Sequence, residues 1–309
     1  MAGWRAPWTA AGQALAQSGS WPVALAGFLA RGGIILFVLP ILVPPSLVGL
    51  ATFIGPASIT PDGPTIGLIV RIGVAVLVGM AALLAGTTVG AAAEIALVRS
   101  GRPALDEPGK GLLGRVTLIR LVSLLPVAIV LGFGIQRLGE IAYLELTLPT
   151  ELVTPIAIRV AARAPEVVAA ILAAWLFGET WGGLATRLAV LRGAGLGRAL
   201  GGGLVLLIRR IAVVVPVLLV SLVVAVLVLG LAVGLVSWSF GFVRDALLGG
   251  VGIGGVAAMI GSTVLFVGCW LVGLGAAAVL ATWRGVAWTL VVGEDHRGSG
   301  GPGPERATL

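Results

Sequence analysis

Five ionisable residues lie in long apolar runs at positions that we expect to reach membrane depth, where a charge has few partners within reach. They are Arg31, Glu94, Glu179, Arg187 and Arg284. At the middle of a lipid bilayer such a charge costs roughly 2.5–3.5 kcal/mol, so it usually needs an opposite charge or a wet cavity. We therefore hypothesise that Glu94 and Glu179 pair with Arg31, Arg187 or Arg284 across neighbouring helices.

The alternative is that these side chains lie within about two turns of a helix end and extend to the lipid headgroups. For Arg187 and Glu94 the position in the run favours this snorkelling. For Glu179 and Arg284 both interpretations stay open. Glu179 is the deepest acid by its position in its apolar run.

Other residue types that carry chemistry are scarce. The chain has one cysteine, Cys269, within an apolar run, and one histidine, His296, in the polar C-terminal stretch. This count excludes an intrachain disulfide, a cysteine-based metal site and a histidine-based triad inside the apolar runs. Glu140, Glu145 and Glu151 share one loop without a catalytic motif, and we interpret them as a solvated face. The glycines lack the strand–GxGxxG–helix context of a nucleotide site. We expect neither an enzyme nor a cofactor.

The composition indicates that lipid surrounds most of the chain. Of 309 residues, 58% are hydrophobic and 11% are charged, whereas a soluble domain carries about 25% charged residues. A helix needs roughly 20 apolar residues to cross a hydrocarbon core of ~30 Å, and the chain has room for six such spans. The net charge of +7 comes from arginines in the loops, where retention in the cytoplasm explains them and nucleic acid does not.

We predict an all-α fold, a polytopic six-helix transmembrane bundle. The transmembrane domain covers residues 23–292, between an interfacial N-terminal segment (1–22) with Trp4, Trp8 and Trp21 and a disordered tail (293–309). Prolines lack a backbone donor, so Pro40, Pro44 and Pro45 should kink or end the first span and Pro126 the third. The sixth run is long enough to tilt, to break near residues 273–275 or to extend beyond the bilayer. The expected spans are 23–50, 66–98, 116–135, 166–191, 209–239 and 251–292.

Three similar segments end the even-numbered apolar runs. Gly86-x-Thr88-x-Gly90 matches Gly178-x-Thr180-x-Gly182 at an offset of 92 residues (178 − 86). A poorer third copy keeps a Thr, a Trp and a Gly. This self-similarity predicts a bundle built from three similar helical hairpins. The copies are residues 86–101, 178–193 and 281–294.

Small residues also recur at four-residue spacing. In lipid such pairs let two helix backbones approach closely, so we expect packing faces there. Because the chain has 48 glycines, some pairs arise by chance. The pairs are Gly86 with Gly90, Gly178 with Gly182, and Ala257 with Gly261.

Basic residues alternate between loops. The second and fourth loops are rich in arginine, the first has none, and in the fifth Arg244 is offset by Asp245. The positive-inside rule then places both termini in the cytoplasm. The long third loop has a mixed charge, and within it residues 154–165 could form a short surface helix.

This layout resembles the membrane domain found beside some bacterial glycerophosphodiester phosphodiesterases, and the stand-alone bacterial membrane proteins related to it. The shared features are six spans, both ends inside, a Trp-bearing start and even-numbered helices that end in G-x-T-x-G-like segments leading to Arg. The resemblance implies a helical membrane module. The catalytic barrel of those enzymes is missing, with its histidine and metal-binding acids, so their activity is not implied.

We expect a non-catalytic accessory or scaffold module of the bacterial inner membrane, linked to lipid or envelope processes. Its expected partners are membrane lipids and other membrane proteins, not nucleic acid. The alternative is a small permease or transporter subunit with a substrate path between hairpins. A permease should show a hydrated cavity lined by Glu179, Arg284, Thr88 or Thr180, and a scaffold should show a dry, Gly/Ala-packed centre. A membrane enzyme ranks third.

Overall fold

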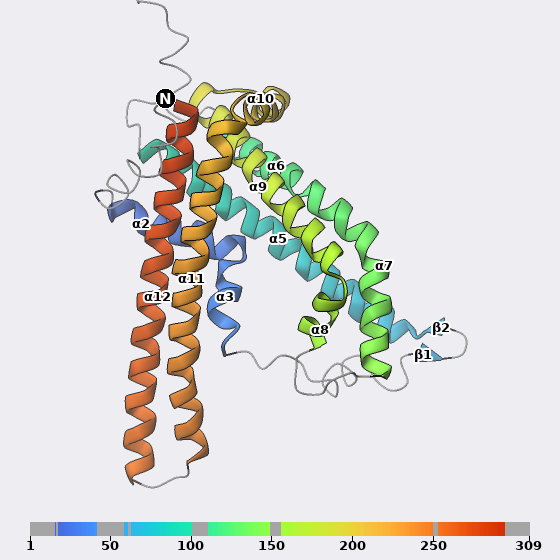
Figure 1. Cartoon of the computed structure of the whole chain (residues 1–309), viewed down its shortest axis with the longest axis vertical. Coiled ribbons are helices and arrows are strands. Elements are labelled where there is room, and N and C mark those ends of the chain that lie inside the picture. Colours follow the sequence, from blue (N-terminus) through green and yellow to red (C-terminus); the bar gives the residue numbers. More distant parts are fainter. Residues whose placement is uncertain are drawn as a thin grey trace, which may run out of the picture. The chain divides into compact units, whose positions relative to one another are not determined.

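The computed structural model of the chain describes residues 16, 18–41, 59–60, 63–100, 111–148, 156–249 and 253–293 (Figure 1). This part is helical apart from two short strands and connecting turns, which agrees with the predicted all-α class. As predicted, six helical stretches among these residues are long and apolar enough to cross a membrane. They are Trp21–Val38, Ile69–Ser100, Leu112–Glu145, Pro165–Arg192, Ile211–Leu248 and Gly254–Val292.

The chain divides into two compact units. The first comprises Met1–Ile41, Thr87–Arg120 and Thr180–Leu309, and the second comprises Leu42–Gly86 and Leu121–Glu179. Most of the predicted interfacial segment and of the polar tail lies outside the described residues. The three-hairpin repeat stays a prediction.

A long helical hairpin forms one part of the first unit (Figure 1). Its two helices are α11 (Ile211–Leu248) and α12 (Ile253–Gly293), which pack along each other. The helix α12 continues through residues 273–275, so the break considered there is not present. At about 1.5 Å per residue, both helices are longer than a 30 Å hydrocarbon core requires.

The first span is a broken helix. It consists of α2 (Trp21–Phe28), the π-helical turn Leu29–Gly33 and α3 (Ile34–Val38). The break falls at Gly32, whose φ of 97° is a conformation that glycine adopts readily. The helix ends at Val38, two residues before Pro40, which agrees with the prediction that the prolines kink or end this span. Pro44 and Pro45 lie outside the described residues. The kink brings Arg31 to the neighbouring helices.

Parts of three more helices belong to the first unit. They are the residues after 86 in α5 (Ile66–Ser100), the residues up to 120 in α6 (Leu112–Ser123) and the residues after 179 in α9 (Pro165–Arg192). Small residues let these three helices pack closely there. Their shared core includes Ala91, Val98, Ile119, Ala185 and Ala189. A second core joins α9 to the hairpin through residues such as Leu184, Val217 and Val291.

The fourth loop contains a helix that the sequence analysis did not predict. This helix, α10 (Leu196–Arg209), buries Ala199, Gly203 and Leu206 on one face. These residues follow a spacing of four and then three, which is the helical period. Four glycines among its residues hide this period from a reading of the sequence, because glycine is unfavourable in a helix.

The second unit contains α7 (Leu125–Thr147), the short helix α8 (Ile156–Arg163) and the first parts of α5 and α9. The helix is interrupted between α6 and α7, and Pro126 lies in the first turn of α7, in agreement with the predicted kink. The predicted end of the third span at residue 135 is wrong, because α7 continues to Thr147. The short helix expected at 154–165 is present as α8. A two-residue ladder pairs β1 (Ile59–Thr60) with β2 (Gly63–Pro64) in antiparallel register.

Candidate functional site

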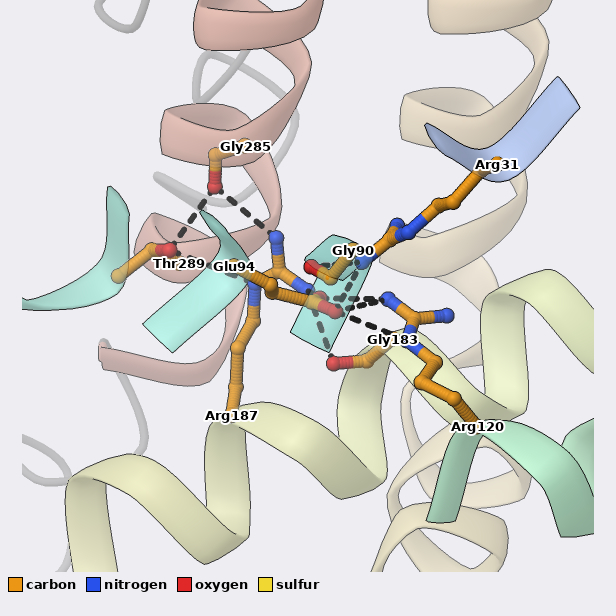
Figure 2. A network of polar contacts seen from close by, with 8 residues as sticks. All are labelled: Arg31, Gly90, Glu94, Arg120, Gly183, Arg187, Gly285 and Thr289. Atoms are coloured by element: carbon orange, nitrogen blue, oxygen red, sulfur yellow. Dashed lines mark hydrogen bonds and ion pairs between the residues drawn. The ribbon is translucent and has the colours of Figure 1, made fainter. Parts of the chain in front are cut away.

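A dense polar cluster surrounds the carboxylate of Glu94 in the first unit (Figure 2). Glu94 is only 6% exposed. Arg120 donates from Nε to Oε2 at 2.8 Å and from Nη2 to both carboxylate oxygens at 2.5 and 2.6 Å. Arg31 Nη2 lies 2.7 Å from Oε2, and Arg187 Nη1 lies 3.1 Å from Oε1. One carboxylate thus binds three guanidinium groups.

The arginines of this cluster also donate to oxygens of their own helix and of neighbouring helices. Arg187 donates to the carbonyl oxygens of Gly183 (2.9 Å) and Gly285 (3.1 Å), and to the hydroxyl of Thr289 (3.3 Å). Arg31 Nη2 donates to the carbonyl oxygen of Gly90 at 3.0 Å. The cluster therefore joins the first-span kink, α5, α6, α9 and α12.

Gly90 makes room for the guanidinium group of Arg31, and Gly183 lies beside that of Arg187. A Cβ atom at Gly90 would lie 2.7 Å from Arg31 Nε and 3.0 Å from its Cγ. A Cβ atom at Gly183 would lie 3.4 Å from Arg187 Nη1. Gly90 was predicted to belong to a helix-packing face, and the group that packs on it is an arginine side chain.

Three residues of the cluster lie at similar distances from the C-terminal ends of their helices. Glu94 is six residues before the end of α5 (100 − 94), Arg187 five before the end of α9 (192 − 187), and Thr289 four before the end of α12 (293 − 289). These three residues come from the three similar segments found in the sequence. Each segment forms the end of a long helix, and the ends meet around one carboxylate.

The predicted ionisable residues have different outcomes. The hypothesis that Glu94 pairs with Arg31 or Arg187 agrees with the structure, since both ion pairs are present. Snorkelling is wrong for Glu94 and Arg187, because both side chains point into contacts between helices and Arg187 is 4% exposed. Glu179 and Arg284 are partly buried, and the pairing hypothesised for them stays a prediction.

Arg120 is the member of the cluster that the sequence analysis missed. It lies near the start of the predicted third span (116–135), where a basic side chain usually reaches the headgroups, yet it is buried and makes the shortest contact to Glu94. A signal was present in the sequence. Glu94 and Arg120 lie six and eight residues from the facing ends of consecutive helices (100 − 94; 120 − 112), so they reach similar depth.

The other small-residue pairs also differ from one another. Gly178 is buried, and a Cβ atom there would clash with the backbone oxygen of Ser123, which is close packing of the predicted kind. Gly182 is buried and Gly86 is partly buried. Ala257 and Gly261 are exposed, and the described chain places no atom within 4 Å of a Cβ at Gly261. That pair is not a packing face within this part of the chain.

A second ion-pair cluster lies in the second unit. Glu145 of α7 is 0% exposed and binds Arg159 Nη1 at 3.0 Å and Arg163 Nε at 2.8 Å, both from α8. Its interpretation as a solvated residue was wrong, because α8 folds back and supplies two cations. Glu140 is exposed, as predicted, and Glu151 lies outside the described residues.

The contacts of Glu94 favour a structural role. Charge-assisted hydrogen bonds are stronger than neutral ones, and both carboxylate oxygens accept them from guanidinium groups. Both carboxylate oxygens are therefore occupied by hydrogen bonds from arginine side chains. Within the described ranges, no group of three or more His, Cys, Asp or Glu could hold a metal ion.

Comparisons of the chain with protein-family models, with curated proteins and with solved structures give no match. The resemblance to the membrane domain of phosphodiesterases stays a prediction. The function is therefore inferred from the cluster and from the helices that carry it.

Proposed function

We propose that this chain is a non-catalytic integral membrane protein that serves as an accessory or scaffold module of the bacterial inner membrane. In this proposal it acts in lipid or envelope processes, with both termini in the cytoplasm. Membrane lipids and other membrane proteins are its partners. The observation that carries the proposal is the Glu94 cluster, which uses intramembrane charge to hold helices together.

Charged residues inside a membrane mark either a path for ions and substrates or a contact between helices. Here Glu94 contacts Arg31, Arg120 and Arg187, which lie on three different segments. Arg187 extends the network to α12 through Gly285. Such a network is suited to fixing the relative positions of helices, which is what a scaffold requires.

The packing around the cluster supports a dry centre for the first unit. Thr180, which a permease would place in a hydrated path, is 4% exposed. Thr186 and Thr282 are fully buried. The first unit also contains apolar cores that include Leu184 and Ile119.

Arginines at helix ends support the proposed orientation. Arg115 Nη1 donates to the carbonyl oxygens of Gly193 (3.2 Å) and Ala194 (3.1 Å), just after α9. Arg210 Nη1 donates to Val291, near the end of α12, at 3.3 Å. Cations at the C-terminal ends of helices are favoured by the helix dipole, and the positive-inside rule assigns arginine-rich ends to the cytoplasm.

Accessibility of Thr180 to water tests the proposal. In a Cys269→Ala background, Thr180→Cys should resist a membrane-impermeant maleimide from either side of the membrane and react fully after denaturation. Labelling of the native protein from either side would instead indicate a hydrated path and favour the permease.

A matched control uses Leu248→Cys, at the exposed end of α11. In the proposed orientation this cysteine reacts only from the side opposite the cytoplasm. Reaction only from the cytoplasmic side would reverse the orientation.

Partner binding is tested separately by a photo-crosslinking amino acid at Leu231, an exposed residue of α11. A scaffold should give a discrete protein adduct at this or another exposed position of the hairpin. Adducts to lipid alone at every such position would argue against a partner-binding role.

A further inference from the structure

The helix α10 has an unusual outer surface. Its buried face packs on α9, where Trp181 Nε1 donates to the carbonyl oxygen of Leu200 at 2.9 Å. Its outward residues combine exposed apolar side chains with exposed arginines. The apolar ones are Leu204, Val205 and Ile208, and the arginines are Arg198 and Arg209.

This segment carries positive charges only. Residues 192–210 contain four arginines and no acid. A water-exposed helix with this sequence would place Ile208, which is 65% exposed, against solvent. The same surface suits a bilayer interface, where apolar side chains enter the acyl boundary and arginines reach the phosphates.

The depth of α10 agrees with an interfacial position. Its close contacts on α9 are at Ala185, where a Cβ atom at Gly203 would lie 3.0 Å from the backbone nitrogen, and at Leu188. Ala185 lies seven residues before the end of α9 (192 − 185), or about 10 Å along the helix. The helix α10 therefore lies beside the last turns of a span and not beyond its end.

The direction of α10 also fits this position. Figure 1 shows α10 nearly end-on, while α11 and α12 run along the view's vertical axis. The helix α10 thus crosses the direction of the hairpin within the same unit. If α11 and α12 cross the bilayer, α10 lies roughly along its surface.

We propose that α10 is an in-plane helix that binds the headgroups of anionic phospholipids. Arg198 and Arg209 contact the lipid phosphates, and Leu204 and Ile208 enter the acyl boundary beside them. Guanidinium groups bind phosphate through paired hydrogen bonds, and basic residues near the ends of spans attract anionic lipid. This inference rests on the proposed membrane location and names one class of lipid partner, but it does not depend on the Glu94 cluster.

Native mass spectrometry of the full chain from nanodiscs with equal phosphatidylglycerol and phosphatidylcholine tests the proposal. The wild type should retain phosphatidylglycerol in excess. The double variant Arg198→Gln/Arg209→Gln should lose this excess, with a binding constant about 30-fold weaker, because each basic residue near an anionic surface contributes a factor of about five. Equal retention of the two lipids by the wild type would overturn the proposal.

A matched control replaces another exposed arginine, Arg244→Gln, near the C-terminal end of α11. It should keep the phosphatidylglycerol excess. Loss of the excess in this control, or its survival in the double variant, would also overturn the assignment to α10.

A second measurement tests the position of the helix without changing its charge. A nitroxide at Ile208→Cys, in the Cys269→Ala background, should be relaxed more by oxygen, which partitions into lipid, than by a water-soluble nickel chelate. Stronger relaxation by the nickel chelate would place α10 in water and contradict the proposal.

Discussion

Replacing Glu94 by glutamine should strongly destabilise the first unit. Glutamine keeps the size of the side chain, but it removes the negative charge and turns one acceptor oxygen into a donor that faces N–H groups. Arg120 and Arg187 are buried and would lose their contact with the carboxylate, while Arg31 is partly exposed and can turn away. The substitution therefore disturbs two buried cations more than the third.

The expected magnitude follows from the burial of these groups. Removing one partner of a buried ion pair costs about 3–5 kcal/mol. This lowers the ratio of folded to unfolded protein by roughly two to three and a half powers of ten, at about 1.4 kcal/mol per tenfold. The measurement is unfolding in mixed micelles with increasing SDS, followed by far-UV circular dichroism.

The control is Glu166→Gln, which removes a carboxylate from an exposed pair. Glu166 Oε1 lies 3.9 Å from Arg137 Nε, and both side chains are more than half exposed. An exposed pair contributes about 0–1 kcal/mol, so this variant should unfold close to the wild type. Equal midpoints for the Glu94 and Glu166 variants would refute the structural role of the cluster.

Further substitutions test the glycine site and the second cluster. Gly90→Ala should lower the free energy of unfolding by about 1–3 kcal/mol in the same assay, because its Cβ would overlap Arg31. Gly261→Ala has open space around the new Cβ and should be neutral or slightly stabilising. Equal losses of stability in the two variants would contradict this reasoning. Glu145→Gln should weaken the attachment of α8 to α7 and so increase proteolysis and hydrogen exchange across residues 156–163. Unchanged protection of these residues would show that the contact with Arg159 does not hold α8 in place.

The sequence predicts the long helices because lipid imposes a simple length rule. An apolar run of sufficient length is a span whatever its neighbours are, so all six stretches were found. The ends of the helices were less predictable. The helix α7 continues past residue 135 because Glu145, a charge that suggested a loop, is neutralised by Arg159 and Arg163 of α8.

The polar cluster was predictable in part. Glu94, Arg31 and Arg187 stand out because they interrupt apolar runs, and their pairing follows from the cost of a charge in lipid. Arg120 was not assigned because a basic residue near a span end usually reaches the headgroups. Whether such a side chain is buried or reaches the headgroups depends on how neighbouring helices pack around it. The sequence does not show that packing.

The repeated segments were identified from Gly and Thr spacing, yet their ends meet through residues outside that pattern. Glu94, Arg187 and Thr289 differ in type and come from the three copies. The repeat predicts that three helices end in similar segments. Because these residues differ in chemical type, Arg187 can donate to both Glu94 and Thr289, and the three form a single polar cluster. The three-hairpin architecture itself remains to be tested.

Hydrogen exchange in lipid nanodiscs, read by mass spectrometry for the wild type and Glu94→Gln, tests the central claim most directly. If Glu94 ties several helices together, the variant should lose protection at once in the ends of α5, α9 and α12 and in α6. Loss of protection confined to α5, with α6, α9 and α12 unchanged, would contradict the claim that this carboxylate holds the helices together.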